Sequence, residues 1–187
     1  LFELYNTKLE EHLIGLQQSP ASRTAINQLR MDMSEECKKF AKNESGIYSL
    51  SIPTGGGKTL ASLRYALNHA LEHGKERIIY VIPYTSIIDQ NAKLVKAILD
   101  DDTNIVEHHS NVDFGSSNEK ELDDELDEML MNKREKIRLA TDNWDAPIIF
   151  TTMVQYLNAF YAKGNRNTRR LHNLTNAVVI FDEVQKV

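Results

Sequence analysis

The sequence has little cysteine and no long apolar run. Cysteine occurs once among 187 residues, at Cys37, so neither a disulfide framework nor a cysteine zinc site can form within the chain. This usage is typical of a protein from a reducing cytoplasm. Because no apolar stretch could span a bilayer and no signal peptide is evident, we expect a cytoplasmic protein that does not contact a membrane.

Positive charge is also in short supply. The chain carries 22 Lys and Arg against 27 Asp and Glu, a formal net charge of -5. This balance excludes a nucleic-acid binder that depends on blanket positive charge, but not one that holds phosphates with helix N-termini and backbone amides. Much of the negative charge lies in residues 119–128, within a predicted amphipathic helix over 119–139. Its acidic face is either solvated or a partner site.

The length of the chain fits about one domain with a good core. The sequence begins at Leu1 rather than methionine and stops two residues beyond Gln185, so we expect it to be a piece of a longer protein.

A glycine-rich segment lies between an apolar run at 47–50 and a helical pattern. It reads Ser-Ile-Pro-Thr-Gly-Gly-Gly-Lys-Thr over 51–59. We interpret it as a strand end, a phosphate-binding loop and a helix N-terminus, because consecutive glycines let amides close around phosphate oxygens and the helix dipole attracts anions. Lys58 would reach the β- and γ-phosphates of ATP and Thr59 would bind Mg²⁺. The predicted cradle is Thr54, Gly55, Gly56, Gly57, Lys58 and Thr59. The alternative is a glycine-rich turn that happens to precede a lysine.

Two carboxylates follow an apolar run near the other end of the chain. Residues 177–181 read Ala-Val-Val-Ile-Phe and predict a strand buried on both faces of a parallel sheet. Asp182 and Glu183 would then lie where open α/β sheets bind ligands. We expect Asp182 to hold Mg²⁺ and Glu183 to orient and polarise the attacking water, with Lys58 as the third catalytic group. A solvated acidic turn is the alternative.

The order of elements predicts an α/β fold, a mostly parallel sheet flanked by helices and preceded by N-terminal helices. We divide the chain into an N-terminal helical segment, 1–45, and a nucleotide-binding domain, 46–187. The expected strands are 47–52, 77–82, 104–108, 148–151 and 178–182. The expected helices are one ending near 17–20, then 22–42, 58–73, 85–99, 119–139 and 153–162. On the second helix, we expect one stripe formed by Ile26, Leu29, Met33, Cys37 and Phe40.

Two strand-to-helix corners lie between the nucleotide signatures. At the first, a proline ends the strand and Thr85 or Ser86 is expected to cap the next helix, whose N-terminus suits a phosphate of a single nucleic-acid strand. This corner resembles motif Ia of helicases, and the second resembles motif Ib. The residues that the resemblance implies for nucleic-acid binding are Pro83, Thr85, Ser86, Gln90, Thr151, Thr152 and Gln155. Ordinary strand-helix connections are the alternative at both corners.

The four signatures in this order resemble the first RecA-like P-loop NTPase domain of a superfamily 2 helicase. The Asp-Glu-Val-Gln of 182–185 and the Val-Glu-His-His-Ser-Asn of 106–111 resemble the CRISPR-associated helicase-nuclease of type I interference systems. That resemblance implies ATP and Mg²⁺ as cofactors, single-stranded DNA as substrate and recruitment to the type I CRISPR surveillance complex. It also implies a second RecA-like domain and an HD nuclease domain, and this sequence contains neither; no His-Asp dipeptide occurs in it.

The resemblance has three further implications. Superfamily 2 enzymes often hold adenine with a glutamine upstream of the first motif, where this chain has Asn27, Gln28 and Arg30; an exposed helix face is the alternative. Gln185 replaces the family's usual histidine or aspartate at the position that couples hydrolysis to DNA. Since an arginine from the second domain is worth roughly 10³ to 10⁵ in rate, we expect this chain alone to bind ATP with negligible turnover.

Two alternatives to this function stay open, one from another class and one from the same class. The chain is either a motor domain or a docking module that binds a protein partner without nucleotide. Within the motor class, a restriction translocase or an RNA helicase is the alternative to a DNA helicase.

Overall fold

The computed structural model describes residues 1–109, 135, 139–161 and 165–183, with backbone only for 21 and 165–168. Its strands are β1 Arg77–Ile82, β2 Ile105–His108, β3 Ile148–Thr152 and β4 Ala177–Phe181. Its helices are α1 Phe2–Gln18, the 3-10 helix η1 Pro20–Arg23, α2 Ala25–Phe40, α3 Lys58–His73, α4 Thr85–Leu99, α6 Met153–Tyr161 and α7 Asn165–Leu174. None of the described helices is long and apolar enough to cross a membrane.

The four strands form one parallel sheet in the order β2-β3-β1-β4. Ile79 of β1 lies beside Ile149 on one side and Val179 on the other. Because parallel strands end at the same edge, the loops that follow all four strands gather on one rim. The predicted α/β class and parallel sheet are confirmed.

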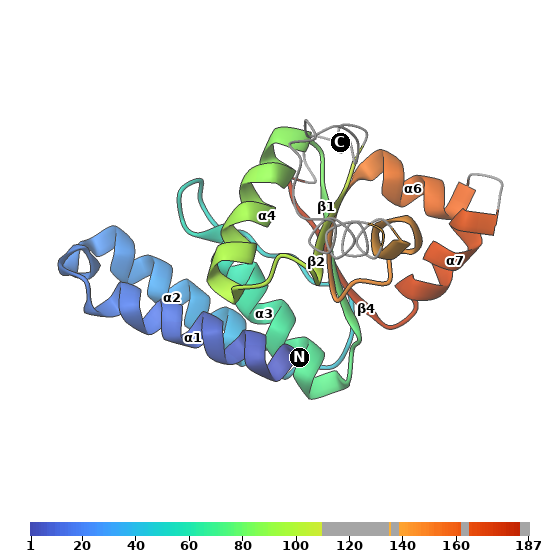
Figure 1. Cartoon of the computed structure of the whole chain (residues 1–187). Coiled ribbons are helices and arrows are strands. Elements are labelled where there is room, and N and C mark those ends of the chain that lie inside the picture. Colours follow the sequence, from blue (N-terminus) through green and yellow to red (C-terminus); the bar gives the residue numbers. More distant parts are fainter. Residues whose placement is uncertain (110–134, 136–138, 162–164, 184–187) are drawn as a thin grey trace, which may run out of the picture.

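Helices cover both faces of the sheet, with α3 and α4 on one face and α6 and α7 on the other (Figure 1). Alternate residues of β1 explain the two cores. Ile78 and Ile82 pack against α3 and α4, whereas Ile79 and Val81 pack towards Trp144. A central strand that is apolar on both faces is what a parallel sheet requires.

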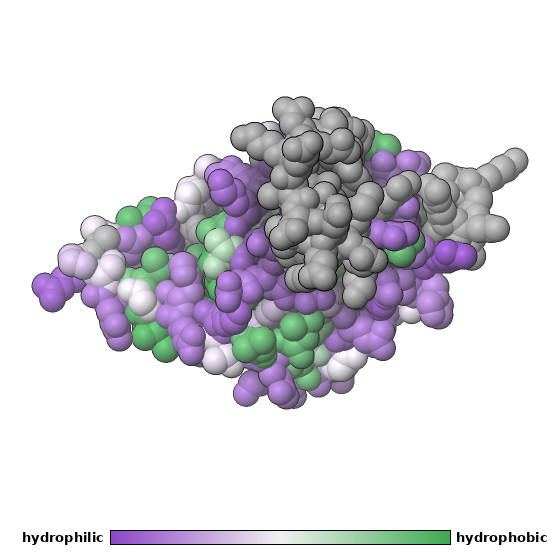
Figure 2. All heavy atoms as spheres, in the orientation of Figure 1, coloured by the Kyte–Doolittle hydropathy of each residue, from purple (hydrophilic) through white to green (hydrophobic). Residues whose placement is uncertain are grey.

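The N-terminal helices form a hairpin that packs on α3 and extends away from the sheet (Figure 1). Tyr5 and Leu9 of α1 are buried in the core beside α3. The visible face of the molecule is mostly hydrophilic, with scattered apolar groups (Figure 2). The stripe predicted on α2 is only partly correct: Cys37 is buried, but Ile26 and Leu29 are about half exposed, because the hairpin continues beyond the surface it covers.

The strand predicted at 47–52 is wrong. These residues have no regular secondary structure and pair with no strand in the described part of the chain. Ile47 is fully exposed, and only Ile52 is buried, in a small cluster with Cys37. A strand is stabilised by backbone hydrogen bonds to a neighbouring strand. The hydrogen bond of the Tyr48 side chain is local, from its hydroxyl to the Glu44 carbonyl.

The run at 177–181 is a strand, but it is not buried on both faces as predicted. Since β4 lies at the edge of the sheet, only Val178 is fully buried and Phe181 is exposed. Helix α7 was not predicted, because its sequence is mostly polar and basic. The predicted acidic helix at 119–139 lies almost wholly outside the described residues.

Candidate nucleotide-binding site

The glycine-rich loop is folded by a tight turn. The Gly56 amide donates to the Pro53 carbonyl at 2.8 Å, and Gly55, the third residue of the turn, has a φ of 79° that favours glycine. A Cβ on Gly56 would lie 2.5 Å from the Ile52 side chain and 2.8 Å from the Pro53 carbonyl oxygen. Space at Gly56 and conformation at Gly55 therefore both require glycine.

Helix α3 begins directly after this loop. Its N-cap is Gly57, in the left-handed conformation, and its first residue is Lys58. The first amides of a helix have no intrahelical acceptor and lie at the positive end of the dipole. The loop therefore leads into the kind of helix end that binds phosphate.

Lys58 joins the loop to the carboxylates that follow β4. Its Nζ donates to Glu183 Oε1 at 2.8 Å and lies 3.8 Å from Asp182 Oδ1. The hydrogen bond to Glu183 raises the pKa of Lys58 above its ordinary value; partial burial opposes this shift, and the charge of Asp182 adds to it. The two sequence signatures thus meet at one point.

The backbone at Glu183 is held in an uncommon conformation. Its φ is 55°, and its amide donates to Asp182 Oδ1 at 3.0 Å. A left-handed conformation costs a non-glycine residue about 1 kcal/mol or more, and such strain is concentrated at functional sites. The Glu183 carboxylate lies beside Lys58 in this conformation.

Thr59 contacts the neighbouring helix. Its Oγ1 donates to Asn91 Oδ1 of α4 at 3.3 Å. Sequence reasoning missed Asn91, because an asparagine in the second turn of a helix gives no local signal of a contact with the loop. Hydroxyl and carboxylate oxygens are the ligands that Mg²⁺ prefers, so Thr59 and Asp182 suit the ion assigned to them.

Helix α2 carries Gln28 and Arg30, the two residues predicted to bind adenine, and their surroundings differ. The Arg30 Nε donates to the Gly55 carbonyl at 2.7 Å, and an NH₂ group of Arg30 donates to Asn27 Oδ1 at 2.7 Å. Gln28 is exposed on the same helix. The structure therefore associates Arg30 with the loop backbone, while the adenine-binding role predicted for both residues stays a prediction.

The first corner on the sheet rim differs from its predicted detail. Tyr84, rather than Thr85 or Ser86, is the N-cap of α4, and its side chain makes no capping hydrogen bond within the described part of the chain. Pro83 ends the strand and is half-buried, and Gln90 is exposed one turn into the helix. The predicted capping was wrong, because the chain enters the helix one residue earlier.

The second corner contains one buried and one accessible hydroxyl. Thr151 is fully buried, and its hydroxyl donates to the His108 carbonyl at 3.0 Å. Thr152 Oγ1 accepts a hydrogen bond from the Gln155 amide at 3.3 Å and so caps α6. Gln155 is half-buried. Gln185, the predicted coupling residue, lies outside the described residues.

Both ring nitrogens of His108 lie close to a nitrogen of another side chain. The Trp144 indole donates to Nδ1 at 3.2 Å, and an NH₂ group of Arg170 lies 3.2 Å from Nε2. Burial, reinforced by the positive charge of Arg170, lowers the pKa of His108 to about 4. Trp144 is fully buried and Arg170 is also buried, so this cluster lies inside the protein.

Asp89, Glu107 and His109 form a group whose ligand atoms all lie within 4.8 Å of one another. The polar atoms of this group already have protein partners. His109 Nε2 lies 3.0 Å from Asp89 Oδ1, and Lys96 Nζ forms an ion pair of 2.6 Å with Glu107 Oε1. We therefore treat these contacts as links between α4 and the end of β2. His108, the last residue of β2, contacts Trp144, whereas His109, the next residue, contacts Asp89 of α4, so the two rings have different partners.

Comparisons with known proteins agree with this geometry. A family model described as "Type III restriction enzyme, res subunit" matches residues 16–186. The CRISPR-associated nuclease/helicase Cas3 of Haloferax volcanii is 27% identical over 198 residues, which cover 95% of this chain and 21% of that protein. A protein assigned provisionally to the same nuclease/helicase in Methanocaldococcus jannaschii is 27% identical over 150 residues, 79% of this chain and 20% of that protein.

The chain spans about a fifth of the length of these relatives. The predicted RecA-like fold and the predicted resemblance to the CRISPR-associated family are both confirmed. The chain belongs to the type III restriction enzyme res-subunit family of helicase domains, and it is a Cas3-like first helicase domain.

Proposed function

We propose that this chain is the ATP-binding motor domain of an ATP-dependent DNA helicase or translocase that acts in type I CRISPR interference. The observation that carries the proposal is the meeting of Lys58 with Glu183 and Asp182 at the carboxyl ends of parallel strands. A lysine on a glycine-rich loop and a pair of carboxylates on an adjacent strand are the two parts that hold nucleotide phosphates and magnesium in this class of enzyme.

Each part of the site has a separate task in this proposal. The amides of the loop and of the first turn of α3 bind the phosphate oxygens, and Lys58 turns from Glu183 towards the terminal phosphates. Thr59 and Asp182 would hold Mg²⁺, and the bound ion would supply positive charge close to the phosphates. Glu183, released from Lys58, orients the attacking water.

DNA would bind along the rim formed by the carboxyl ends of the strands. The exposed Ser86 and Gln90 on α4 and the half-buried Thr152 before α6 lie at the two corners that would each hold a phosphate. Helix ends and hydroxyls, rather than lysine clusters, would supply this grip, in keeping with a net charge of -5. Affinity should then decrease only moderately with salt.

The activity of a whole helicase would require more than one domain. Turnover would need a second RecA-like domain, whose closure on ATP and opening after hydrolysis would move the DNA between the two domains. By itself, the chain would bind ATP with negligible turnover. The division into 1–45 and 46–187, the cytoplasmic location, the HD nuclease domain and recruitment by the CRISPR surveillance complex belong to this proposal too.

ATP-driven unwinding by the intact enzyme tests this function. Lys58→Ala and Glu183→Gln should both abolish unwinding of a duplex with a single-stranded tail. Lys58→Ala should also weaken ATP binding, whereas Glu183→Gln should leave binding within about threefold. A circular dichroism spectrum like that of the wild type would show that the fold is intact. Unwinding at the normal rate by either variant would contradict the assignment.

A further inference from the structure

The carbonyl groups of a phosphate-binding loop must point away from the anion. When successive amides turn inward to form a concave site for phosphate, the carbonyl oxygens turn outward and need partners of their own. In this loop the Pro53 carbonyl accepts from the Gly56 amide, inside the turn. The Gly55 carbonyl accepts from a side chain of another element, Arg30 of α2.

Arg30 lies beside the loop at Gly55 and at Gly57. Its Nε donates to the Gly55 carbonyl at 2.7 Å, and its aliphatic stem passes 3.7 to 4.0 Å from the position that a Cβ on Gly57 would occupy. Asn27, one turn earlier on α2, accepts a hydrogen bond of 2.7 Å from the guanidinium and fixes its orientation. The guanidinium is therefore held in place from both ends.

The next turn of α2 also lies against the loop. The Met33 methyl carbon lies 3.2 Å from the position that a Cβ on Gly56 would occupy, and Met33 packs on the cluster of Cys37, Ile52 and Ala61. One face of α2 thus lies against the loop at three successive glycines.

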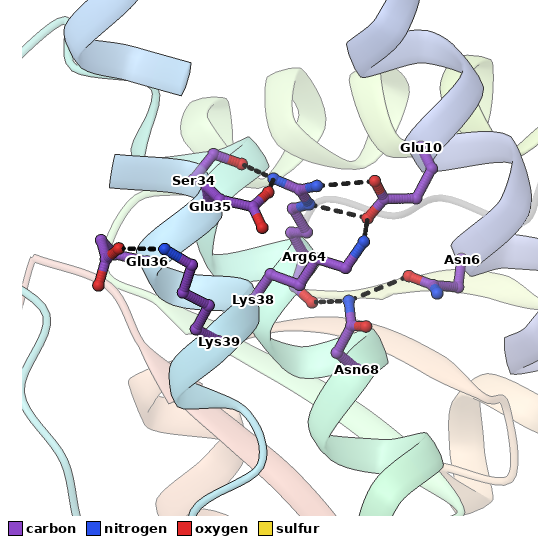
Figure 3. A network of polar contacts seen from close by, with 9 residues as sticks. All are labelled: Asn6, Glu10, Ser34, Glu35, Glu36, Lys38, Lys39, Arg64 and Asn68. Atoms are coloured by element: carbon purple, nitrogen blue, oxygen red, sulfur yellow. Dashed lines mark hydrogen bonds and ion pairs between the residues drawn. The ribbon is translucent and has the colours of Figure 1, made fainter. Parts of the chain in front are cut away.

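Helix α2 is in turn fixed to the helix that follows the loop. Arg64 of α3 forms a bidentate pair with Glu10 of α1, at 2.8 and 2.7 Å, and an ion pair of 2.9 Å with Glu35 of α2 (Figure 3). The loop therefore lies between two helices that are joined by ion pairs. Helix α3 follows the loop in the chain, and helix α2 packs against it.

We propose that Arg30 is a positioning residue for the phosphate loop, which holds the Gly55 carbonyl outward so that the loop amides face the phosphate chain of a nucleotide. This proposal rests on the proposed function, because it assigns Arg30 to the same site. Arg30 acts through the loop backbone and does not contact the nucleotide. Through Arg30, the N-terminal hairpin would contribute to nucleotide binding although it lies outside the glycine-rich motif.

Three variants separate the hydrogen bond from the charge. Arg30→Met keeps most of the aliphatic stem but has no donor. Arg30→Gln places an amide nitrogen at the position of the arginine Nε, without a charge. Arg23→Met, on the exposed η1, removes the same charge away from the loop and is the control.

Titration of a fluorescent ATP and a fluorescent ADP, each with Mg²⁺, gives the first readout. Loss of a hydrogen bond from a charged donor should weaken binding about tenfold in Arg30→Met, while Arg30→Gln stays within about threefold of the wild type and Arg23→Met is unchanged. ATP and ADP should lose affinity equally. An equal loss in the Met and Gln variants would show that charge alone matters, and a larger loss for ATP would show direct contact with the terminal phosphate. Unchanged or tighter binding by Arg30→Met would also overturn the proposal.

Amide hydrogen exchange on the nucleotide-free protein gives a second readout that does not depend on binding. Exchange of the Gly56 amide, which donates to the Pro53 carbonyl, should be about tenfold faster in Arg30→Met than in the wild type or in Arg23→Met, and close to the wild-type rate in Arg30→Gln. Unchanged exchange in Arg30→Met would overturn the proposal. Wild-type protein that binds no nucleotide would contradict the proposed function instead, and exchange would still decide the role of Arg30.

Discussion

Replacement of Arg64 by methionine should destabilise the protein more than any exposed charge change of the same kind. The Arg64 side chain is 8% exposed, and it connects α3 to both helices of the N-terminal hairpin (Figure 3). Besides its pairs with Glu10 and Glu35, it donates to Ser34 Oγ at 3.4 Å. Burial opposes ionisation of Glu10, but the hydrogen bonds from Arg64 and Lys38 outweigh it and lower the pKa of Glu10.

The magnitude follows from what the substitution leaves behind. Removing one partner of a buried ion pair typically costs about 3 to 5 kcal/mol, because the other charge stays desolvated. Glu10 is 24% exposed and keeps Lys38 at 3.1 Å, and Glu35 is 48% exposed, so water and Lys38 compensate in part. We therefore expect a loss of about 3 kcal/mol. For a chain of this length, that loss lowers the melting temperature by about 6 to 12 °C.

Urea unfolding of Arg64→Met, Glu10→Gln and the double variant measures this term. The coupling free energy between the two positions should be about 2 kcal/mol, since they share two hydrogen bonds. Lys39→Met is the control, because the Lys39–Glu36 pair is exposed and should contribute little to stability. A loss below about 1 kcal/mol for Arg64→Met, or one equal to that of Lys39→Met, would refute the reasoning.

Two further predictions concern the loop and His108. Gly56→Ala should destabilise the protein by about 1 to 3 kcal/mol and weaken ATP binding, because its Cβ would contact backbone at 2.8 Å; in a melting experiment, Gly15→Ala, with open space around it, should be neutral or stabilising. Equal effects of the two substitutions would contradict the packing assigned to the loop. Since the pKa of His108 falls from 6.5 when unfolded to about 4 when folded, the unfolded state binds more protons between these values, and stability should decrease as pH falls through this window. Urea unfolding between pH 7 and pH 4.5 should show a smaller decrease for His108→Gln, and identical slopes would show that His108 is not the group responsible.

Elements with strong local signals were predicted well. Helix α3 was predicted with the bounds observed, Lys58–His73, because glycines in left-handed conformation precede and follow it. Strand β1 was likewise predicted as observed, since its apolar run lies between charged residues and a proline. In both cases the determinants lie within the element or next to it.

Elements that depend on distant residues were predicted poorly. Residues 47–52 have the composition of a strand, but a strand also needs a partner, and none lies beside them in the described part of the chain. Helix α7 has few apolar residues, and it is held in part by Arg170, whose Nε donates to the Asp142 carbonyl at 2.8 Å. No periodicity in the sequence could reveal that contact.

The candidate site divides in the same way. Lys58 and Glu183 could be predicted to meet, because the phosphate loop and the carboxyl end of a parallel strand lie on the same rim. The contacts of Arg30 with Gly55 and of Asn91 with Thr59 could not, because they depend on how helices pack against the loop.

The most direct test of the nucleotide site is a titration of fluorescent ATP with Mg²⁺ into this chain, beside Lys58→Ala. The account predicts saturable binding by the wild type and at least tenfold weaker binding by Lys58→Ala, with unchanged circular dichroism. Equal affinity of the two proteins for ATP would contradict the assignment of Lys58 to the phosphates, and with it the reading of this chain as a motor domain.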